Sequence, residues 1–337
     1  MNPSRRKLLQ TSAALAGSLA LPRLAGAQAL TTTAAATAAS ATIDGPIRIV
    51  LPYPPGGSTD AITRFIADRL GAALKQTVIV ENRPGAAGMI GAAQVAKSPA
   101  DGRTLLFTNT ALIQSPLIQP KPLYDPMTDF DPLSLVADAA QVFVANADLP
   151  VKSLRDYAAW AKAHPGSAYG SLGVGSTGHL YGELFKRRAQ VEIVHAAYKG
   201  DAPAIADLLA KQLPAGFVST VVARTYGEAG RIKVLATLGT TRVPSMPDVP
   251  TFAESGYQGF EAIGWIGMLA PHGCARPVID RLSAEIARIV RSPDGSRMLT
   301  EAGMLPRGTS ADEFAALLKR DQKVWQALVQ QTGIRVG

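Results

Sequence analysis

A short stretch around residue 55 joins an apolar run, a loop of prolines and glycines, and an amphipathic segment. The run Ile-Arg-Ile-Val-Leu at 47–51 is rich in β-branched residues and ends at a proline, which predicts a buried strand. Apolar side chains then recur at helical spacing from residue 62 to residue 70, with Ser58 or Thr59 as the expected N-cap. We expect a strand, a tight loop and a helix in direct succession.

The loop in this stretch, residues 52–60 and called the first loop below, has the composition of an anion-binding site. Gly56 and Gly57 let the backbone come close to a guest. Unpaired amide groups at the start of a helix attract negative charge. Asp60 is expected to complete the helix start through its carboxylate. We interpret the first loop as a cradle for an anion, and an ordinary strand-to-helix turn is the alternative.

A second glycine-rich segment, residues 169–180, repeats this logic with glycines and small hydroxyl residues before a helix-like run. Its central part, residues 171–177, is called the second loop below. It too suits an oxyanion at a helix N-terminus, and a plain turn is again the alternative. His179 lies one helical turn after Ser176, so we expect it to cap or orient the loop rather than act as a base.

The second loop also carries the glycine spacing of a dinucleotide fingerprint. Gly173, Gly175 and Gly178 are spaced as G-x-G-x-x-G, and Glu192 follows nineteen residues after the first glycine. The fingerprint requires an apolar strand directly before it, and residues 167–170 do not read as one. Because this requirement is not met, a twin-arginine-exported NAD(P)-dependent oxidoreductase is kept only as the alternative function. Neither serine of this segment has the nucleophile-elbow pattern.

The N-terminus has the pattern of a secretory signal. Paired arginines precede a short apolar run and a small-x-small site that ends at Ala27, which predicts a twin-arginine signal peptide over residues 1–27. The apolar run is too short, and interrupted by Pro22, for a membrane span, although an uncleaved anchor is the alternative. Residues 28–45 are expected to form a flexible Ala/Thr-rich leader. The protein is therefore predicted to be periplasmic, without stable membrane insertion.

Charge and cysteine content exclude several classes of site. Cleavage removes four basic residues and no acid, so the formal charge falls from +8 to +4, with no run of five like charges. We expect no nucleic-acid partner. The lone Cys274 excludes an internal disulfide framework and a cysteine-based metal cluster, and the four histidines show no metal-ligand spacing. No paired carboxylates stand out for acid–base chemistry, so we expect no cofactor, no metal and no catalytic residues.

Strand-like and helix-like runs alternate along the chain, which predicts an α/β fold with mostly parallel sheets. Proline-rich breaks near residues 120–132 and 242–250 suggest two crossings between domains. We predict a discontinuous first domain, residues 46–141 plus 241–337, and an inserted second domain, residues 142–240. The two crossings would act as hinges.

Taken together, these segments resemble the Bug-type substrate-binding proteins of tripartite tricarboxylate transporters. The resemblance runs from residue 46 to about residue 333 and is carried by the order and spacing of several motifs. These are residues 52–60, 81–88, 100–106, 169–180, 198–200, 246–251 and 265–271. It implies a two-lobed, flytrap-like periplasmic-binding-protein fold of type II that closes on a small organic carboxylate.

The resemblance also implies a set of ligand-binding residues. The family pins ligand carboxylates with the loop after the first strand and with the Ser/Gly loop of the inserted domain, and the segment after the third strand borders the cleft. Carried over, the ligand-binding residues are Tyr53, Pro54, Gly56, Gly57, Ser58, Thr108, Asn109, Ser171, Gly175, Ser176, Thr177 and Tyr198. The implied partners are membrane permease subunits or a sensor ectodomain, and we expect a monomer that is not an enzyme.

One departure from the family pattern concerns two acidic positions in residues 211–218. Pro214 and Val218 stand where relatives usually carry acids. We expect this change to weaken the case for an amino-acid ligand and to make that wall of the site more apolar. A relative that has lost its ligand and serves as an interaction protein is the third possible function.

Overall fold

The computed structural model describes residues 43–335. The predicted signal peptide, its cleavage near Ala27 and nearly all of the leader lie outside the described residues. Those described belong to one compact unit. Within residues 43–335, no helix has both the length and the apolar character needed to cross a bilayer.

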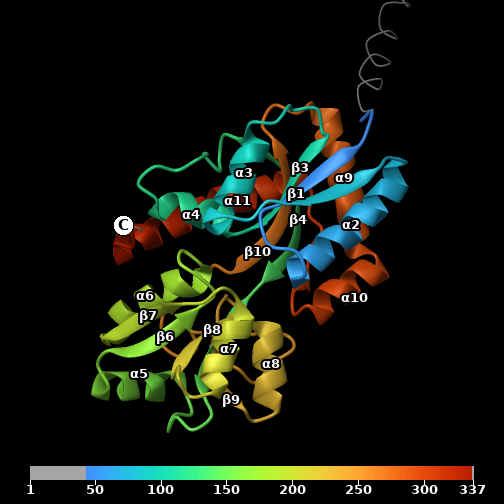
Figure 1. The fold of residues 1–337 in the computed structure, drawn as a ribbon. Helices are drawn as coiled ribbons and strands as arrows, with labels where there is room; N and C mark the ends of the chain where they lie inside the picture. The colour runs from blue at the N-terminus through green and yellow to red at the C-terminus, as the bar shows by residue number, and fades with distance from the viewer. Residues whose placement is uncertain (1–42, 336–337) are drawn as a thin grey trace, which may run out of the picture. The chain divides into compact units, whose positions relative to one another are not determined.

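The first of two sheets has six strands in the order β11-β4-β10-β3-β1-β2 (Figure 1). β1, next to the edge strand β2, pairs in parallel with β2 and β3, while β10 runs antiparallel to β3 and β4. The loops after β1, β2 and β3 therefore leave the sheet at the same edge. The strands are β1 (Ile47–Leu51), β2 (Val78–Asn82), β3 (Thr104–Asn109), β4 (Phe130–Ala139), β10 (Gly264–Pro271) and β11 (Leu305–Pro306).

The second sheet has five strands in the order β7-β6-β8-β5-β9. Here β6 pairs in parallel with β7 and β8, and β5 runs antiparallel to β8 and β9. The strands are β5 (Gln141–Asn146), β6 (Ser167–Ser171), β7 (Ile193–Ala197), β8 (Ala215–Ser219) and β9 (Ile232–Thr237). We call the part built on the six-stranded sheet lobe A and the part built on the five-stranded sheet lobe B.

Helices cover both sheets, and the C-terminal helix contacts both lobes. The helix α11 packs against β4 and α4 of lobe A and against α6 of lobe B. The helices are α2 (Ser58–Leu74), α3 (Met89–Ala96), α4 (Ala111–Ile118), α5 (Leu154–Ala163), α6 (Thr177–Ala189), α7 (Asp201–Leu209), α8 (Thr220–Glu228), α9 (Arg276–Arg291), α10 (Pro293–Glu301) and α11 (Ala311–Thr332), with the short 3-10 helix η1 (Ala86–Gly88) before α3.

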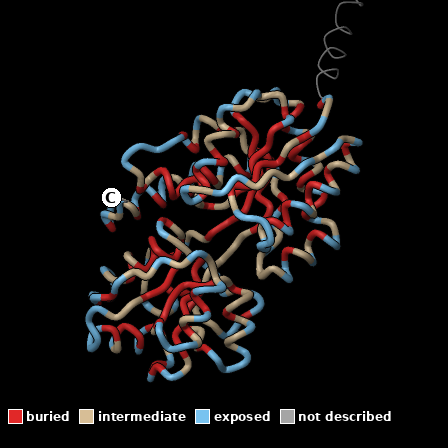
Figure 2. The backbone as a smooth tube through the Cα atoms, in the orientation of Figure 1, coloured by how far each residue is buried: buried red, intermediate tan, exposed pale blue. Residues whose placement is uncertain are grey.

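The largest apolar core continues from one lobe into the other (Figure 2). In lobe B it is aromatic, with the rings of Phe143 and Phe217 4.9 Å apart in an edge-on arrangement. Trp325 of α11 is fully buried 5.3 Å from the ring of Tyr181 in α6. Burial of such large side chains stabilises the packing of α11 against both lobes.

The chain crosses between the lobes at two places, which are located by the ends of the strands. It leaves lobe A after β4 at Ala139 and enters lobe B in β5 at Gln141. It returns between the end of β9 at Thr237 and the start of β10 at Gly264. The two sheets with flanking helices agree with the predicted α/β class. The expectation of mostly parallel sheets is wrong, because β4, β5, β10 and β11 add antiparallel pairs to both sheets. The domain boundaries at 141/142 and 240/241 stay predictions.

Two strands of lobe B depart from the sequence-based expectation. Residues 167–171 form the strand β6, although they do not read as an apolar strand, and residues 215–219 form β8. Tyr169, Gly170 and Ser171 are all buried because neighbouring strands cover both edges of β6 and α6 packs against it. The short, glycine-containing run is a strand through its surroundings rather than through its own propensity.

Candidate functional site

The first loop presents free backbone amides at the start of α2. The N-cap is Gly57, in an extended conformation and without a side-chain cap, so the prediction of Ser58 or Thr59 is wrong. None of the hydrogen bonds among residues 43–335 uses the N–H groups of residues 57–59. Residues 54–58 are exposed. The helix start therefore offers an exposed set of donors to an anion.

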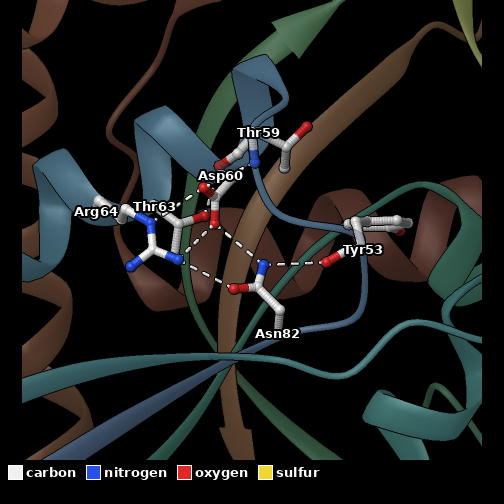
Figure 3. A network of polar contacts seen from close by, with 7 residues as sticks. Tyr53, Thr59, Asp60, Thr63, Arg64 and Asn82 are labelled. Atoms are coloured by element: carbon white, nitrogen blue, oxygen red, sulfur yellow. Dashed lines mark hydrogen bonds and ion pairs between the residues drawn. The ribbon is translucent and has the colours of Figure 1, made fainter.

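The carboxylate of Asp60 stabilises the first loop through several hydrogen bonds (Figure 3). Its carboxylate accepts the Gly56 N–H at 3.1 Å and two hydrogen bonds from the Arg64 guanidinium at 3.0 Å. Asn82, at the end of β2, donates to the same carboxylate at 3.0 Å and to the Tyr53 carbonyl at 3.1 Å. The Arg64 hydrogen bonds, followed by those of Asn82 and Gly56, lower the pKa of Asp60 to about 2.

This network decides which parts of the first loop face a ligand. The Gly56 amide is occupied by Asp60, so it does not serve an anion in this arrangement. Asp60 is itself 6% exposed and its charge is neutralised by Arg64. The backbone amides of residues 57–59 are thus left as hydrogen-bond donors, and the nearby Asp60 carboxylate has its charge balanced by Arg64.

The segment after β3 lies beside the first loop. The Tyr53 hydroxyl is 3.4 Å from the Thr108 hydroxyl, and Asn109 accepts the backbone N–H of Ala111 through its side-chain carbonyl at 2.9 Å. Burial raises the pKa of Tyr53 to about 12, which keeps its hydroxyl a neutral donor. The structure therefore brings Tyr53 and Thr108 together, as the family resemblance implied.

The second loop is organised by two serines. Ser176 is the N-cap of α6 and accepts the His179 N–H at 3.3 Å, while its own hydroxyl donates to the Gly173 carbonyl at 2.7 Å. Ser171 is fully buried at the end of β6, and its hydroxyl lies 3.3 Å from the Ser176 hydroxyl and 2.7 Å from Nε2 of His195. The loop thus has hydroxyl groups and a helix N-terminus in one place.

Two stacked histidines lie under the second loop. The rings of His179 and His195 are 3.8 Å apart and nearly parallel, and Nδ1 of His179 accepts the Gly175 N–H at 3.0 Å. Burial lowers the pKa of His179, and burial together with His179 lowers that of His195 to about 3. Both rings are neutral near pH 7, and His179 orients the loop as the sequence indicated.

The segment after β3 connects to the second loop through α4. Gln114 donates to the Thr177 hydroxyl at 2.9 Å, and both side chains are buried. Gly175 packs against Ile118, since a Cβ at residue 175 would lie 2.5 Å from Cδ1 of Ile118. In this arrangement the second loop of lobe B is in contact with α4 of lobe A.

The remaining predicted residues divide between the two loops. The Tyr198 backbone N–H donates to the Ser171 carbonyl at 3.0 Å, and its hydroxyl donates to Asp207 at 2.7 Å. Pro54, Gly57 and Ser58 remain exposed in the first loop. Among the described residues, no hydrogen bond joins residues 53–58 directly to residues 171–177. The structure thus groups the predicted residues into two clusters, and Gln114 of lobe A bonds Thr177 in the second of them.

The geometry of the second loop contradicts the dinucleotide alternative. The expectation that no strand precedes the glycines is wrong, so the contradiction has another cause. The strand β6 does precede the glycines, and Gly178 packs closely on Phe217. However, Glu192 lies just before β7, where its carbonyl accepts the Gly166 N–H at the start of β6. Because β6 and β7 are parallel, Glu192 is at the opposite end of the sheet from the second loop. It cannot reach a ribose held at these glycines.

The two departures from the family pattern do not line an open site. Val218 is fully buried in an apolar cluster with Val142 and Leu208, so it forms no wall of a cleft. Pro214 directly precedes β8, whose partner β6 runs parallel, so it lies at the end of the sheet away from the second loop. The expectation of a more apolar wall is therefore wrong, because β8 is a central strand with Val218 facing the core.

Sequence reasoning missed three residues that shape the two clusters: Asn82, Gln114 and His195. Asn82 belongs to the motif at residues 81–88, which was the available signal. Gln114 and His195 carried no local signal, because their partners are 63 and 24 residues away.

The neutral histidine pair predicts a pH-dependent stability. The unfolded chain protonates His195 below its ordinary pKa of 6.5, whereas the folded protein does so only near 3. The contribution of neutral His195 to the free energy of unfolding should therefore be complete above pH 6.5. It should decrease as the pH falls, by up to about 1.4 kcal/mol per pH unit. Urea unfolding at pH 7 and 5 measures this, and the His195→Gln variant should lose part of the difference.

The matched control for this experiment is His164→Gln, at an exposed histidine stacked on Trp160. It should keep the wild-type dependence. An equal loss of pH dependence in both variants would contradict the burial of a neutral His195.

Comparison with known proteins shows what the chain is similar to. Residues 62–334 match the family described as tripartite tricarboxylate transporter family receptor. The protein BugT of Bordetella pertussis is 34% identical over 294 residues, which cover 86% of this chain and 90% of BugT.

Solved structures extend this similarity to the fold. The periplasmic binding protein BugD has a TM-score of 0.76 at 32% identity, over 87% of this chain and 99% of BugD. The protein Rpa4515 of R. palustris, solved with adipate, has a TM-score of 0.78 at 33% identity, over 87% and 98%. MatC of Rhodopseudomonas palustris, solved with bound malate, has a TM-score of 0.75 at 28% identity, over 85% and 99%. The predicted two-lobed binding-protein fold is confirmed.

Proposed function

This chain belongs to the tripartite tricarboxylate transporter receptor family, and we propose from that premise that it is a periplasmic receptor for a small organic carboxylate. The ligand would be held between the lobes, with its carboxylates at the first and second loops. Delivery would be to a tripartite tricarboxylate-type permease or to a sensor. The family members compared above are binding proteins rather than enzymes, which supports a non-enzymatic role.

The observation that carries this proposal is the free N-terminus of α2 in the first loop. Residues 57 and 58 are exposed and residue 59 is partly buried, and the N–H groups of residues 57–59 make no hydrogen bond within the described chain. The charge that would repel a carboxylate, Asp60, is already paired with Arg64. A carboxylate placed here gains several backbone donors and the favourable end of the helix dipole.

The second loop supports a second carboxylate contact by a different means. The Ser176 hydroxyl is used within the loop, where it donates to Gly173 and caps α6. The Thr177 hydroxyl at the start of α6 would therefore supply the contact, and the histidines beneath it are neutral. Dicarboxylates fit two such contacts, and Rpa4515 and MatC were solved with adipate and malate. We therefore take dicarboxylates as the first ligands to test.

The periplasmic location and the closing motion follow from sequence and physical argument. The N-terminal segment carries the features of an export signal, and BugD is described as periplasmic. A ligand that contacts both lobes only in a closed arrangement shifts the population toward that arrangement. The crossings after β4 and β9 would serve as the hinges.

Adipate and malate binding, measured by thermal melting and by small-angle scattering, tests this function. A ligand at a hundredfold excess over its Kd should stabilise the protein by about 2.7 kcal/mol and reduce the radius of gyration. Gly57→Val and Ser176→Val should each abolish the ligand-induced closure. A side chain at residue 57 meets no atom within 4 Å, so that variant should still fold.

Thr225→Val is the control, because it removes an exposed hydroxyl in α8 far along the chain from both loops. It should close like the wild type. If both loop variants still close with ligand, the site assignment is wrong. If no carboxylate of the panel changes the melting temperature, the protein is better described as a ligand-free interaction protein of the same fold.

A further inference from the structure

A cavity of about 670 Å³ lies beside the crossings between the lobes, away from the two loops. Its walls come from the end of β4, residues 238–245 and 261–265, the start of α8, residues 300–307, and α11. None of the twelve predicted ligand-binding residues lines it. We call it the hinge cavity. Its volume is in the range of small-molecule sites in proteins.

Part of the wall of the hinge cavity is apolar and exposed. Leu305 and Val324 line it and are 48% and 39% exposed, which places them among the few large apolar side chains exposed in residues 43–335. Ile263 and Leu317 continue this apolar surface. Exposed apolar side chains gathered around a hollow are a common property of binding sites.

The charged part of the wall is dominated by arginines. Arg224 of α8 is partly buried, and within residues 43–335 it makes no hydrogen bond or ion pair. Arg307 is paired with Asp138 at 3.6 Å, and Arg320 is paired with Asp321 at 3.6 Å. Both distances are long for an ion pair. The fourth arginine of the lining, Arg242, is paired with Glu254 at 3.0 Å. Within the described residues, the cavity thus contains one cation with no partner, two that are loosely paired and one that is closely paired.

Three acids, Asp138, Glu261 and Asp321, lie on the same wall. Asp321 is 4% exposed and accepts a hydrogen bond from the Trp265 indole at 3.1 Å. Burial raises its pKa to about 6, and burial also raises the pKa of Asp138. Glu261 accepts the Gly259 N–H at 3.0 Å. The lining thus holds four arginines and three acids, and no acid of the lining is paired with Arg224.

We propose that the hinge cavity binds an amphipathic anion, a small molecule with one carboxylate head and an apolar body. Arg224 holds the head, and the apolar body lies along Leu305 and Val324. The site is separate from the proposed dicarboxylate site, since no residue is common to both. A dicarboxylate is a poor occupant, because its second charge would lie against the apolar wall.

Isothermal titration calorimetry of the full chain without its leader with octanoate tests this site. Octanoate is expected to bind, and 1-octanol, which lacks the charge, is expected to bind at least tenfold more weakly. Arg224→Gln should also weaken octanoate binding about tenfold or more, the effect of losing one charged hydrogen bond. Val324→Glu, which places a negative charge at the exposed wall, should abolish binding even if Arg224→Gln disturbs folding.

Two controls separate the hinge cavity from the loops and from general charge effects. Arg231→Gln removes an exposed arginine outside the cavity and should leave octanoate affinity unchanged. Gly57→Val should also retain octanoate binding, because residue 57 is not part of the cavity. Absence of octanoate binding, equal affinity in Arg224→Gln and Arg231→Gln, or loss of binding in Gly57→Val would each overturn the proposal.

Discussion

Gly182→Val is expected to destabilise the protein by about 3 kcal/mol or more, the largest effect on stability that we anticipate. Gly182 lies in α6 directly over the ring of Tyr169, and a Cβ there would overlap the ring carbon Cε2. Tyr169 is fully buried, and its hydroxyl bonds the His179 carbonyl and the Glu183 carboxylate, so the ring is not free to move. Overpacking of this kind strains the backbone and side chains of a closely packed core. Urea unfolding gives the free energy directly.

The control for this prediction is Gly57→Val, the same substitution at a residue with open space around it. It should cost about 1 kcal/mol at most, because it only weakens an N-cap. Similar losses in both variants would mean that α6 is able to shift away from β6, contrary to the close packing described here.

Asp60→Ala is expected to disrupt the first loop and to reduce dicarboxylate affinity more than tenfold. The change removes the acceptor for Gly56, Arg64 and Asn82 at once, which costs about 2 kcal/mol or more of folding free energy. Without that acceptor, the amides of residues 57–59 lose their fixed direction, and a preorganised anion site becomes a mobile one. Hydrogen exchange of residues 52–60 and calorimetry with adipate measure the two effects.

Asp68→Ala provides the matched control, since Asp68 is an exposed acid on the same helix. It should leave exchange and affinity at wild-type values. The low pKa of Asp60 adds a pH test with a definite sign. Its stabilising contribution is complete above its ordinary pKa of 3.8 and is lost as the pH falls toward 2. A first loop that is equally protected in Asp60→Ala and wild type would contradict the role given to this carboxylate.

Local patterns were enough to predict much of the secondary structure. The strand at 47–51 and the helix through residues 62–70 follow from apolar spacing within a few residues, and the structure has both. The helix start was less accurate, because a glycine rather than Ser58 takes the N-cap position when Asp60 bonds the loop from the other side. Cap identity therefore depended on a contact that spacing does not reveal.

The strands β6 and β8 show where local patterns fail. Gly170 and Gly216 lie face to face in the pairing of β6 with β8, where a Cβ on residue 216 would lie 2.9 Å from the Gly170 carbonyl oxygen. Residues with low strand propensity are required there because two backbones approach closely.

The sequence by itself determined the α/β class, the family and the two glycine-rich loops, because these depend on residue type and spacing within short segments. Tertiary structure alone decided that His195 lies under Ser171, that Gln114 bonds Thr177, and that Arg224 faces a cavity. Each of these depends on the order of strands in a sheet or on the crossing of two lobes. Such pairings join residues far apart in the chain, so no local pattern of apolar and polar residues encodes them visibly.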